Sequence, residues 1–170
     1  MRQPFRVLLH GLWEDLQRLD ERLKVLDREI LVLSESHPDA KRLKQLRGIG
    51  PLTATAMVAQ FGDGRQFKRG RQAAASVGIT PRHAGTGGKN WLFGITKTGN
   101  PYLCSILIHG ARSVVSKAKH QDDRLSRWVT DLAERKHVNV AAVALANKTV
   151  RIAWAMLRNG TDYDPELAMA

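Results

Sequence analysis

The first 37 residues repeat apolar positions with a period of about 3.5 residues. Between Phe5 and Leu33 the spacing alternates between four and three, and Asp, Glu, Arg and Gln fill most outer positions. Such a period keeps one narrow apolar stripe facing a partner helix. The pattern predicts a coiled-coil helix over residues 1–37, ended by Pro38, which lacks a backbone donor. The stripe consists of Phe5, Leu9, Leu12, Leu16, Leu19, Leu23, Leu26, Ile30 and Leu33.

The sequence does not decide which helix packs against this stripe. Later helices of the same chain, a long antiparallel hairpin and a second copy of the chain are the alternatives. About 30 residues at 1.5 Å each make a rod of roughly 45 Å. We expect a homo-oligomer that forms through residues 5–33.

A second pattern, over residues 43–60, is typical of a helix–hairpin–helix motif. Two short apolar stretches flank the turn Gly-Ile-Gly at 48–50. The glycines permit tight backbone geometry, and Ile49 would fill the gap between the helices. Backbone N–H groups at the turn would then point at a phosphate, although a purely structural hairpin is the alternative. The candidate DNA-binding residues here are Gly48, Gly50 and Thr53.

The middle of the chain is basic and rich in glycine. Residues 62–72 are expected to form a basic loop, followed by a short helix over 73–77. Residues 78–100 hold six glycines and indicate an irregular loop, with room for a short hairpin around 91–95. Loops of this length are usually functional or disordered, and the aromatic residues within this one argue against disorder. The basic loop contributes Arg65, Lys68, Arg69 and Arg71 as candidate DNA contacts.

Helix signals dominate the last third of the chain. Asn100 and Pro101 suit the cap and first position of a helix that runs to about residue 119. Further helices are expected over 122–136 and about 140–158, the last one capped by Asn139. That last helix is apolar nearly all round, so we expect it to be the central buried helix.

These patterns together predict an all-α fold. We expect a coiled-coil helix over 1–37, one domain over 40–160 and a tail over 161–170. Alternating strand patterns are scarce, and there is no internal repeat.

The basic charge is concentrated in the centre of the sequence. The 170 residues carry a net charge of +11, but residues 40–121 alone carry 14 basic groups against one acidic group. Residues 1–39 have a net charge of −2, and residues 122–170 are neutral. Because a solvated surface usually mixes the two signs, this segment predicts a surface for a polyanion, above all nucleic acid. Generic solubility is the alternative.

The composition of the sequence excludes several classes of protein. A single cysteine, Cys104, excludes an internal disulfide framework and a multi-cysteine zinc site. No apolar run approaches the ~20 residues that span a bilayer, and the N-terminus has no signal-peptide core. We therefore expect a cytoplasmic protein in a reducing compartment, with no membrane partner.

Residue chemistry points to an anion site in the glycine-rich segment. Arg82 and Lys89 supply charge, and the glycine pair at 87–88 lets the backbone approach a phosphate closely. His83 could donate or shuttle a proton. Thr86 is the only residue with a hydroxyl between Pro81 and Lys89, and a turn cap is the alternative role for it.

Four sequence elements carry a resemblance to a known family. They are Gly78-Ile79-Thr80-Pro81, Thr86-Gly87-Gly88-Lys89, Gly94-Ile95-Thr96-Lys97-Thr98-Gly99-Asn100-Pro101-Tyr102-Leu103 and His109-Gly110-Ala111-Arg112. With the turn at 48–50, they resemble the C-terminal domain of insertion-sequence transposases that have an N-terminal RuvC-like DEDD nuclease domain. That family includes the Piv-type invertases and the bridge-RNA-guided recombinases. The resemblance implies a composite active site, formed where the nuclease domain of one subunit meets this domain of another.

The sequence departs from the family pattern at three points. This sequence does not include the nuclease domain. We expect Mg²⁺ to bind in that domain, and we expect no metal or cofactor site in this chain. Thr86 stands at the position of the family's nucleophilic serine, and its methyl group crowds the hydroxyl. Cys104 stands where the family commonly has an arginine.

The favoured interpretation is a transposase or recombinase C-terminal domain with Thr86 as its catalytic hydroxyl. Without a nuclease domain we expect the chain to be catalytically silent. A truncated, non-catalytic DNA-binding and dimerisation module and a basic RNA-binding protein are the alternatives. The resemblance implies a guide RNA as a partner in addition to DNA. It also implies that the protein acts at the bacterial nucleoid. The DNA contacts expected are Gly48, Gly50, Thr53, Arg65, Lys68, Arg69, Arg71, Arg82, Lys89 and Lys97.

Overall fold

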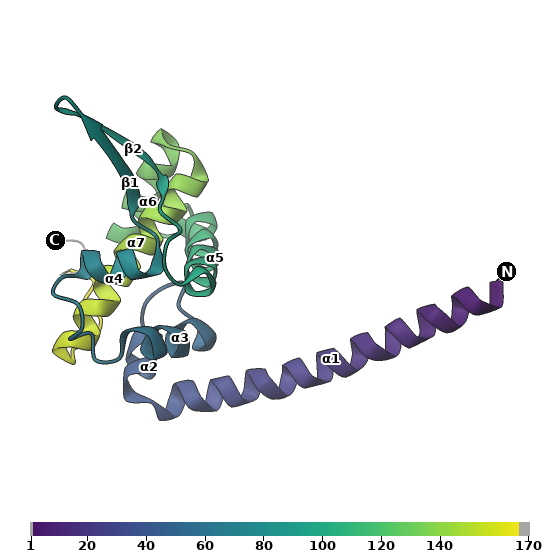
Figure 1. The fold of residues 1–170 in the computed structure, drawn as a ribbon. Helices are drawn as coiled ribbons and strands as arrows, with labels where there is room; N and C mark the ends of the chain where they lie inside the picture. The colour runs from purple at the N-terminus through teal and green to yellow at the C-terminus, as the bar shows by residue number, and fades with distance from the viewer. Residues whose placement is uncertain (1, 167–170) are drawn as a thin grey trace.

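The computed structural model describes residues 2–166, which form a packed body and one long projecting helix (Figure 1). This part of the chain is predominantly helical, which confirms the predicted all-α class. The elements are α1 (Arg2–Ser36), α2 (Pro38–Leu43), α3 (Pro51–Phe61), α4 (Gly70–Val77), β1 (Pro81–Thr86), β2 (Lys89–Ile95), α5 (Pro101–Ala118), α6 (Arg124–Arg135) and α7 (Val138–Asn159).

Helix α1 leaves the body as a single rod of 35 residues (Figure 1). Only its C-terminal end is tied down, where Ser34 is buried and accepts a hydrogen bond from Lys44 Nζ at 3.3 Å. The same ammonium group pairs with Glu35. Along the apolar stripe, Phe5 and the leucines are 43–66% exposed, so later helices of the chain do not cover it.

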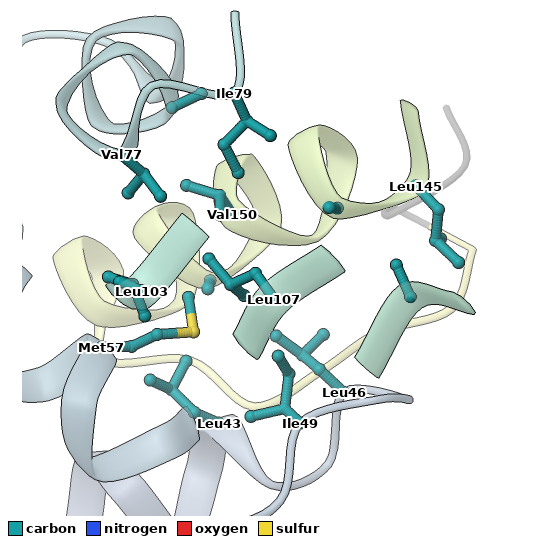
Figure 2. Packing of buried hydrophobic residues seen from close by; sticks show 14 of the residues in the cluster. Leu43, Leu46, Ile49, Met57, Val77, Ile79, Leu103, Leu107, Leu145 and Val150 are labelled. Atoms are coloured by element: carbon teal, nitrogen blue, oxygen red, sulfur yellow. The ribbon is translucent and has the colours of Figure 1, made fainter. Parts of the chain in front are cut away.

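The core lies between α5 and α7, with α4 and the α2–α3 segment packed around them. Figure 2 shows Leu103 and Leu107 of α5 packing beside Val150 of α7 and Met57 of α3. Small residues along α7 let neighbouring helices approach closely, and the prediction that this helix lies at the centre is confirmed.

By length and composition alone, α7 is long and apolar enough to cross a bilayer. This differs from the expectation that no segment of the sequence is. Half of that stretch is buried in the body, as in the core helices of soluble proteins.

The helix ends follow the predicted caps with one exception. The side chain of Asn100 accepts a hydrogen bond from the Leu103 N–H at 3.0 Å and starts α5 as expected. The prediction that Asn139 caps α7 is wrong, because His137 occupies that position and accepts from the Asn139 N–H at 3.1 Å. The side chain of Asn139 instead accepts from Arg112 of α5 at 2.7 Å.

The prediction of an irregular loop over residues 78–100 is wrong for most of that segment. Residues 81–95 form an antiparallel hairpin that rises from the body at the top of Figure 1. Gly87 and Gly88 make its two-residue turn with φ of 57° and 78°, which mirror-image hairpin turns require. Residues 81–89 are exposed, so no buried face imposed the alternating pattern by which strands are detected.

The tail follows the body as far as it is described. The Tyr163 N–H donates to Gln45 Oε1 at 2.8 Å, and Asp162 lies 3.4 Å from Arg42 Nε. The last four residues of the predicted 161–170 tail lie outside the described residues.

Candidate nucleic-acid interface

The hairpin is anchored to the body by backbone hydrogen bonds at its base. The Lys97 N–H donates to the Gly78 carbonyl at 3.1 Å, and the Asn100 N–H donates to the Ser76 carbonyl at 3.2 Å. A Cβ atom at Gly99 would lie 2.3 Å from the Ser76 oxygen, so the chain can pass there only as glycine. These residues of the resemblance motifs therefore hold the hairpin in position.

Thr86 lies at the exposed tip of the hairpin, directly opposite Lys89. Cross-strand neighbours share a face of the sheet and lie about 5 Å apart at Cβ. Trp91, two residues beyond Lys89, is on that face and 48% exposed. His83 is three residues from Thr86 and faces the other side, so it is not placed to serve as a base for that hydroxyl.

A groove runs between the base of the hairpin and the start of α7. It has a volume of about 680 Å³ and brings Arg82 and Lys97 together, as two of the predicted DNA contacts. Its remaining wall is largely apolar, with Phe93 and Val140 about half exposed. Lys97 has a φ of 55°, a left-handed conformation that is unusual for a residue with a side chain.

A second hollow, of about 580 Å³, lies between the start of α4 and the C-terminal half of α7. Arg69, Arg71, Lys148 and Arg151 line it, and so do the carboxylates of Asp162 and Asp164. No ion pair to any of these cations occurs within residues 2–166. Burial lowers the pKa of Lys148, and the nearby charges of Arg151 and Arg124 lower it further.

Sequence reasoning missed Lys148 and Arg151. They belong to the segment with no net charge, which drew no attention to them. Their i, i+3 spacing on a helix was the available signal, because it places both cations on one face.

The turn at 44–50 is packed more tightly than the hairpin. A Cβ at Gly48, whose φ is 80°, would lie 2.8 Å from the Gly110 oxygen of α5, whereas Gly50 has no atom within 4 Å. Thr53 is only 7% exposed, which leaves little of its side chain for a phosphate. The described geometry therefore gives Gly48 a packing role and leaves Gly50 open to solvent at the start of α3.

Arg47, in the same turn, is used internally. Its Nη1 donates to Gln121, Asp123 and Ser126 at 2.7–3.0 Å. Burial acts to raise the pKa of Asp123, but hydrogen bonds from Ser126 and Arg47 outweigh it and bring the pKa from 3.8 to about 2. This cluster joins the turn to the start of α6.

The other predicted residues are spread along the basic loop. Arg65 is exposed and lies 3.4 Å from Asp63, and Lys68 is exposed.

Cys104 is buried in α5, and burial raises the pKa of its thiol. The described residues contain no cluster of three or more His, Cys, Asp or Glu side chains that could hold a metal ion.

Comparison with known proteins places the chain among transposases. Residues 40–126 match the sequence model of the Transposase IS116/IS110/IS902 family. A probable family 20 transposase of Pseudomonas aeruginosa is 45% identical over 162 residues, which cover 95% of this chain and 48% of the relative. The transposase for insertion sequence element IS1111A of Coxiella burnetii is 38% identical, over 92% of this chain and 43% of the relative.

A third relative, the transposase for insertion sequence element IS1328 of Yersinia enterocolitica, is also 38% identical, over 94% of this chain. The chain spans less than half the length of these relatives. The family match covers the turn, the basic loop, the hairpin and α5, which are the elements described above. This chain belongs to the IS116/IS110/IS902 family of transposases.

Proposed function

We propose that this chain is the DNA-binding C-terminal part of its transposase and that Thr86 contributes the hydroxyl nucleophile of a composite strand-exchange site. The observation that carries the proposal is the placement of Thr86 at the tip of an anchored hairpin, opposite Lys89. A group at an exposed tip can enter a site that is completed by another domain.

The chemistry at the tip suits a phosphodiester. Lys89 would stabilise the charge of the phosphate, and the Gly87–Gly88 turn adds no side chain that would block its approach. Arg82 and Lys97 at the base of the hairpin would hold the flanking backbone. Trp91 offers an aromatic surface on which a base could stack.

Activation of the hydroxyl must come from outside the described residues. A threonine hydroxyl is a weak nucleophile at neutral pH and needs a base or a metal ion. Within residues 2–166 the Thr86 hydroxyl has no hydrogen-bond partner, and His83 faces the other side of the hairpin. We propose that carboxylates and Mg²⁺ of a nuclease domain supply the activation, and that the chain alone is silent.

We propose a DNA-binding surface made of the α2–α3 turn, the basic loop and the hollow that Lys148 and Arg151 complete. The exposed start of α3 at Gly50 suits a backbone phosphate, as in a helix–hairpin–helix. If about five phosphates are neutralised, log K should fall with a slope of about −4.5 against log salt for duplex DNA. Binding that does not depend on salt would contradict this surface.

Further partners follow from the same proposal. Self-association through residues 5–33 is supported by the exposed stripe of α1. A guide RNA would compete for the same cations, and the site of action would be the bacterial nucleoid in the cytoplasm.

The decisive experiment supplies a separately expressed RuvC-like nuclease domain to this chain and measures cleavage and strand transfer on supercoiled DNA. We expect no activity from the chain alone, activity from the mixture, faster reaction with Thr86→Ser and none with Thr86→Ala. Thr98→Ala is the matched control, because Thr98 is an exposed threonine of the same segment. Full activity of Thr86→Ala in the mixture, or strand transfer by the chain alone, would refute the assignment.

A second candidate is a non-catalytic DNA-binding and dimerisation module. It is favoured by the separation of the two features it needs, since α1 projects away from the body that carries the cations (Figure 1). On this function the mixture would remain inactive, while salt-dependent DNA binding and self-association would persist.

A further inference from the structure

Most of the exposed large apolar side chains in the described part of the chain lie on helix α1. Its stripe is exposed from Phe5 to Leu26, while the only residues tied to the body lie near Ser34. Isolated apolar stripes of this length are unstable in water and are normally buried against another helix. The inference below rests on the proposed self-association and concerns the orientation of the two copies.

The heptad positions follow from the spacing of the stripe. Taking Leu9 as position a places the other residues of the stripe at a and d without a break. Charged residues then fall at most of the flanking e and g positions, which lie beside the partner helix. The e positions hold Arg6, Trp13, Asp20 and Asp27, and the g positions hold Leu8, Asp15, Arg22 and Glu29.

A parallel, in-register pair has mixed electrostatics. In that geometry each g residue lies near the e residue five positions later on the partner. Asp15 would face the partner's Asp20, a like-charge contact that occurs twice. Arg22 would face the partner's Asp27, also twice, so attraction and repulsion balance.

The body restricts the antiparallel registers. Because α1 ends at Ser36 and the chain turns into α2, a partner helix can extend only to about residue 33. The longest overlap that respects this limit places Phe5 opposite the partner's Ile30 and Leu16 opposite the partner's Leu19. Shifting the pair by one heptad toward the body would run the first turns of each helix into the partner's α2.

The antiparallel register that fits has uniformly favourable charges. In antiparallel pairs g lies near g and e lies near e. Asp15 then faces the partner's Arg22, and Arg6 faces the partner's Asp27, each twice by symmetry. No like-charge pair occurs at these positions.

The charge of the body favours the same orientation. Residues 40–121 carry a net charge of +13, and a parallel pair would place two such bodies at one end. An antiparallel pair separates them by the length of α1, roughly 50 Å at 1.5 Å per residue. That distance is several times the Debye length of about 8 Å at physiological salt, so the repulsion is screened.

We infer that α1 pairs with α1 of a second copy in antiparallel orientation, with Leu16 opposite the partner's Leu19. The two bodies, and with them the two hairpins, then lie at opposite ends of a common rod.

Spin-label distances test the orientation directly. Single cysteines at Gln17, Lys24 and Leu31, which occupy equivalent heptad positions, are introduced in a Cys104→Ala background and labelled. Antiparallel pairing predicts separations along the axis of about 2, 20 and 40 Å in that order. Parallel pairing predicts the same distance for all three, and the antiparallel register shifted by one heptad toward the body predicts a shorter distance at position 24 than at 17.

A charge reversal gives an independent test by sedimentation equilibrium. Asp15→Lys should weaken the dimer about tenfold, because it faces the partner's Arg22, and adding Arg22→Asp to the same chain should restore it. In a parallel pair Asp15→Lys would strengthen the dimer instead. Glu21→Lys, at an outer heptad position, is the matched control and should change little. It also controls for helix effects, since Asp15 bonds Arg18 at 2.9 Å within its own helix.

The outcomes separate this inference from the proposal on which it rests. A monomer at tens of micromolar, where a modest coiled coil still associates, would overturn both. A dimer with equal label distances would overturn the antiparallel orientation and leave self-association standing. A dimer with rising distances and rescue by the double reversal supports the orientation, whether or not Thr86 proves catalytic.

Discussion

The α2–α3 turn and the β1–β2 hairpin both present glycines in a basic stretch, yet the structure uses those glycines in opposite ways. In the turn, Gly48 meets the backbone of Gly110, and the contact leaves no room for a Cβ on either side. In the hairpin, Gly87 and Gly88 have no atom within 4 Å. One pair permits close packing, and the other permits an open tip that a phosphate can approach.

The charges of the two regions differ in the same way. Arg47 of the turn donates its hydrogen bonds to Gln121, Asp123 and Ser126, so it is committed to the fold. Arg82 and Lys89 of the hairpin make no ion pair within the described residues. Arg47 is therefore committed to the fold, whereas Arg82 and Lys89 remain without a carboxylate partner among the described residues.

The largest expected effect is at the glycine contact of the turn. A Cβ at residue 110 would lie 2.1 Å from the Gly48 oxygen, so Gly110→Ala should lower the free energy of unfolding by about 3 kcal/mol or more. Urea denaturation measures the change. Gly11→Ala is the control, because it places the same methyl group on an open helix and should stabilise by about 0.5–1 kcal/mol. A loss below about 1 kcal/mol for Gly110→Ala would remove the packing role.

The hairpin tip should respond locally. Both turn glycines have positive φ, so Gly87→Ala with Gly88→Ala should destabilise the hairpin by about 2 kcal/mol. Hydrogen exchange should be faster for hairpin amides and unchanged for α5 and α7. Gly94→Ala is the control, since that glycine has neither positive φ nor a close neighbour. Global destabilisation by the double variant would show that the tip is not independent of the body.

An acid titration tests the polar side of the turn. The folded pKa of Asp123, about 2, lies below its ordinary value of 3.8, so its contribution to stability is present above pH 4 and is lost as the pH falls through 2. After allowance for solvent screening, Asp123→Asn should cost about 1 kcal/mol at pH 7. The difference between the two proteins should shrink toward pH 2 in urea titrations. A difference that does not depend on pH would mean that packing, and not charge, is at work.

The smallest expected effect on stability is at Gly50. Its φ of −92° suits any residue and no atom lies within 4 Å, so Gly50→Ala should cost only about 0.5 kcal/mol as a helix cap. Duplex affinity should nevertheless fall severalfold at low salt, because the methyl group would separate a phosphate from the backbone N–H groups. Fluorescence anisotropy measures the affinity. Unchanged affinity in the folded variant would remove the turn from the interface.

Local patterns were sufficient for much of this protein. The 3.5-residue period predicted α1, Asn100 with Pro101 predicted the start of α5, and the apolar stretch near the C-terminus predicted a central helix. Each of these depends on interactions between residues a few positions apart, which a sequence displays directly. Thr86 was singled out by the neighbouring residues of its segment together with the family resemblance, and its role stays a prediction.

The tertiary structure decided what no short-range pattern contains. Residues 81–95 form a hairpin where a loop was expected, and hydrogen bonds to the Ser76 and Gly78 carbonyls hold its base to the body. The sequence did not predict its strands because they have no buried face that would impose an alternating pattern. It assigned Gly48 to packing through a contact 62 residues away along the chain, at Gly110. It also brought Lys148 and Arg151 to the basic loop, since only the packing of α4 on α7 joins two segments so distant in sequence.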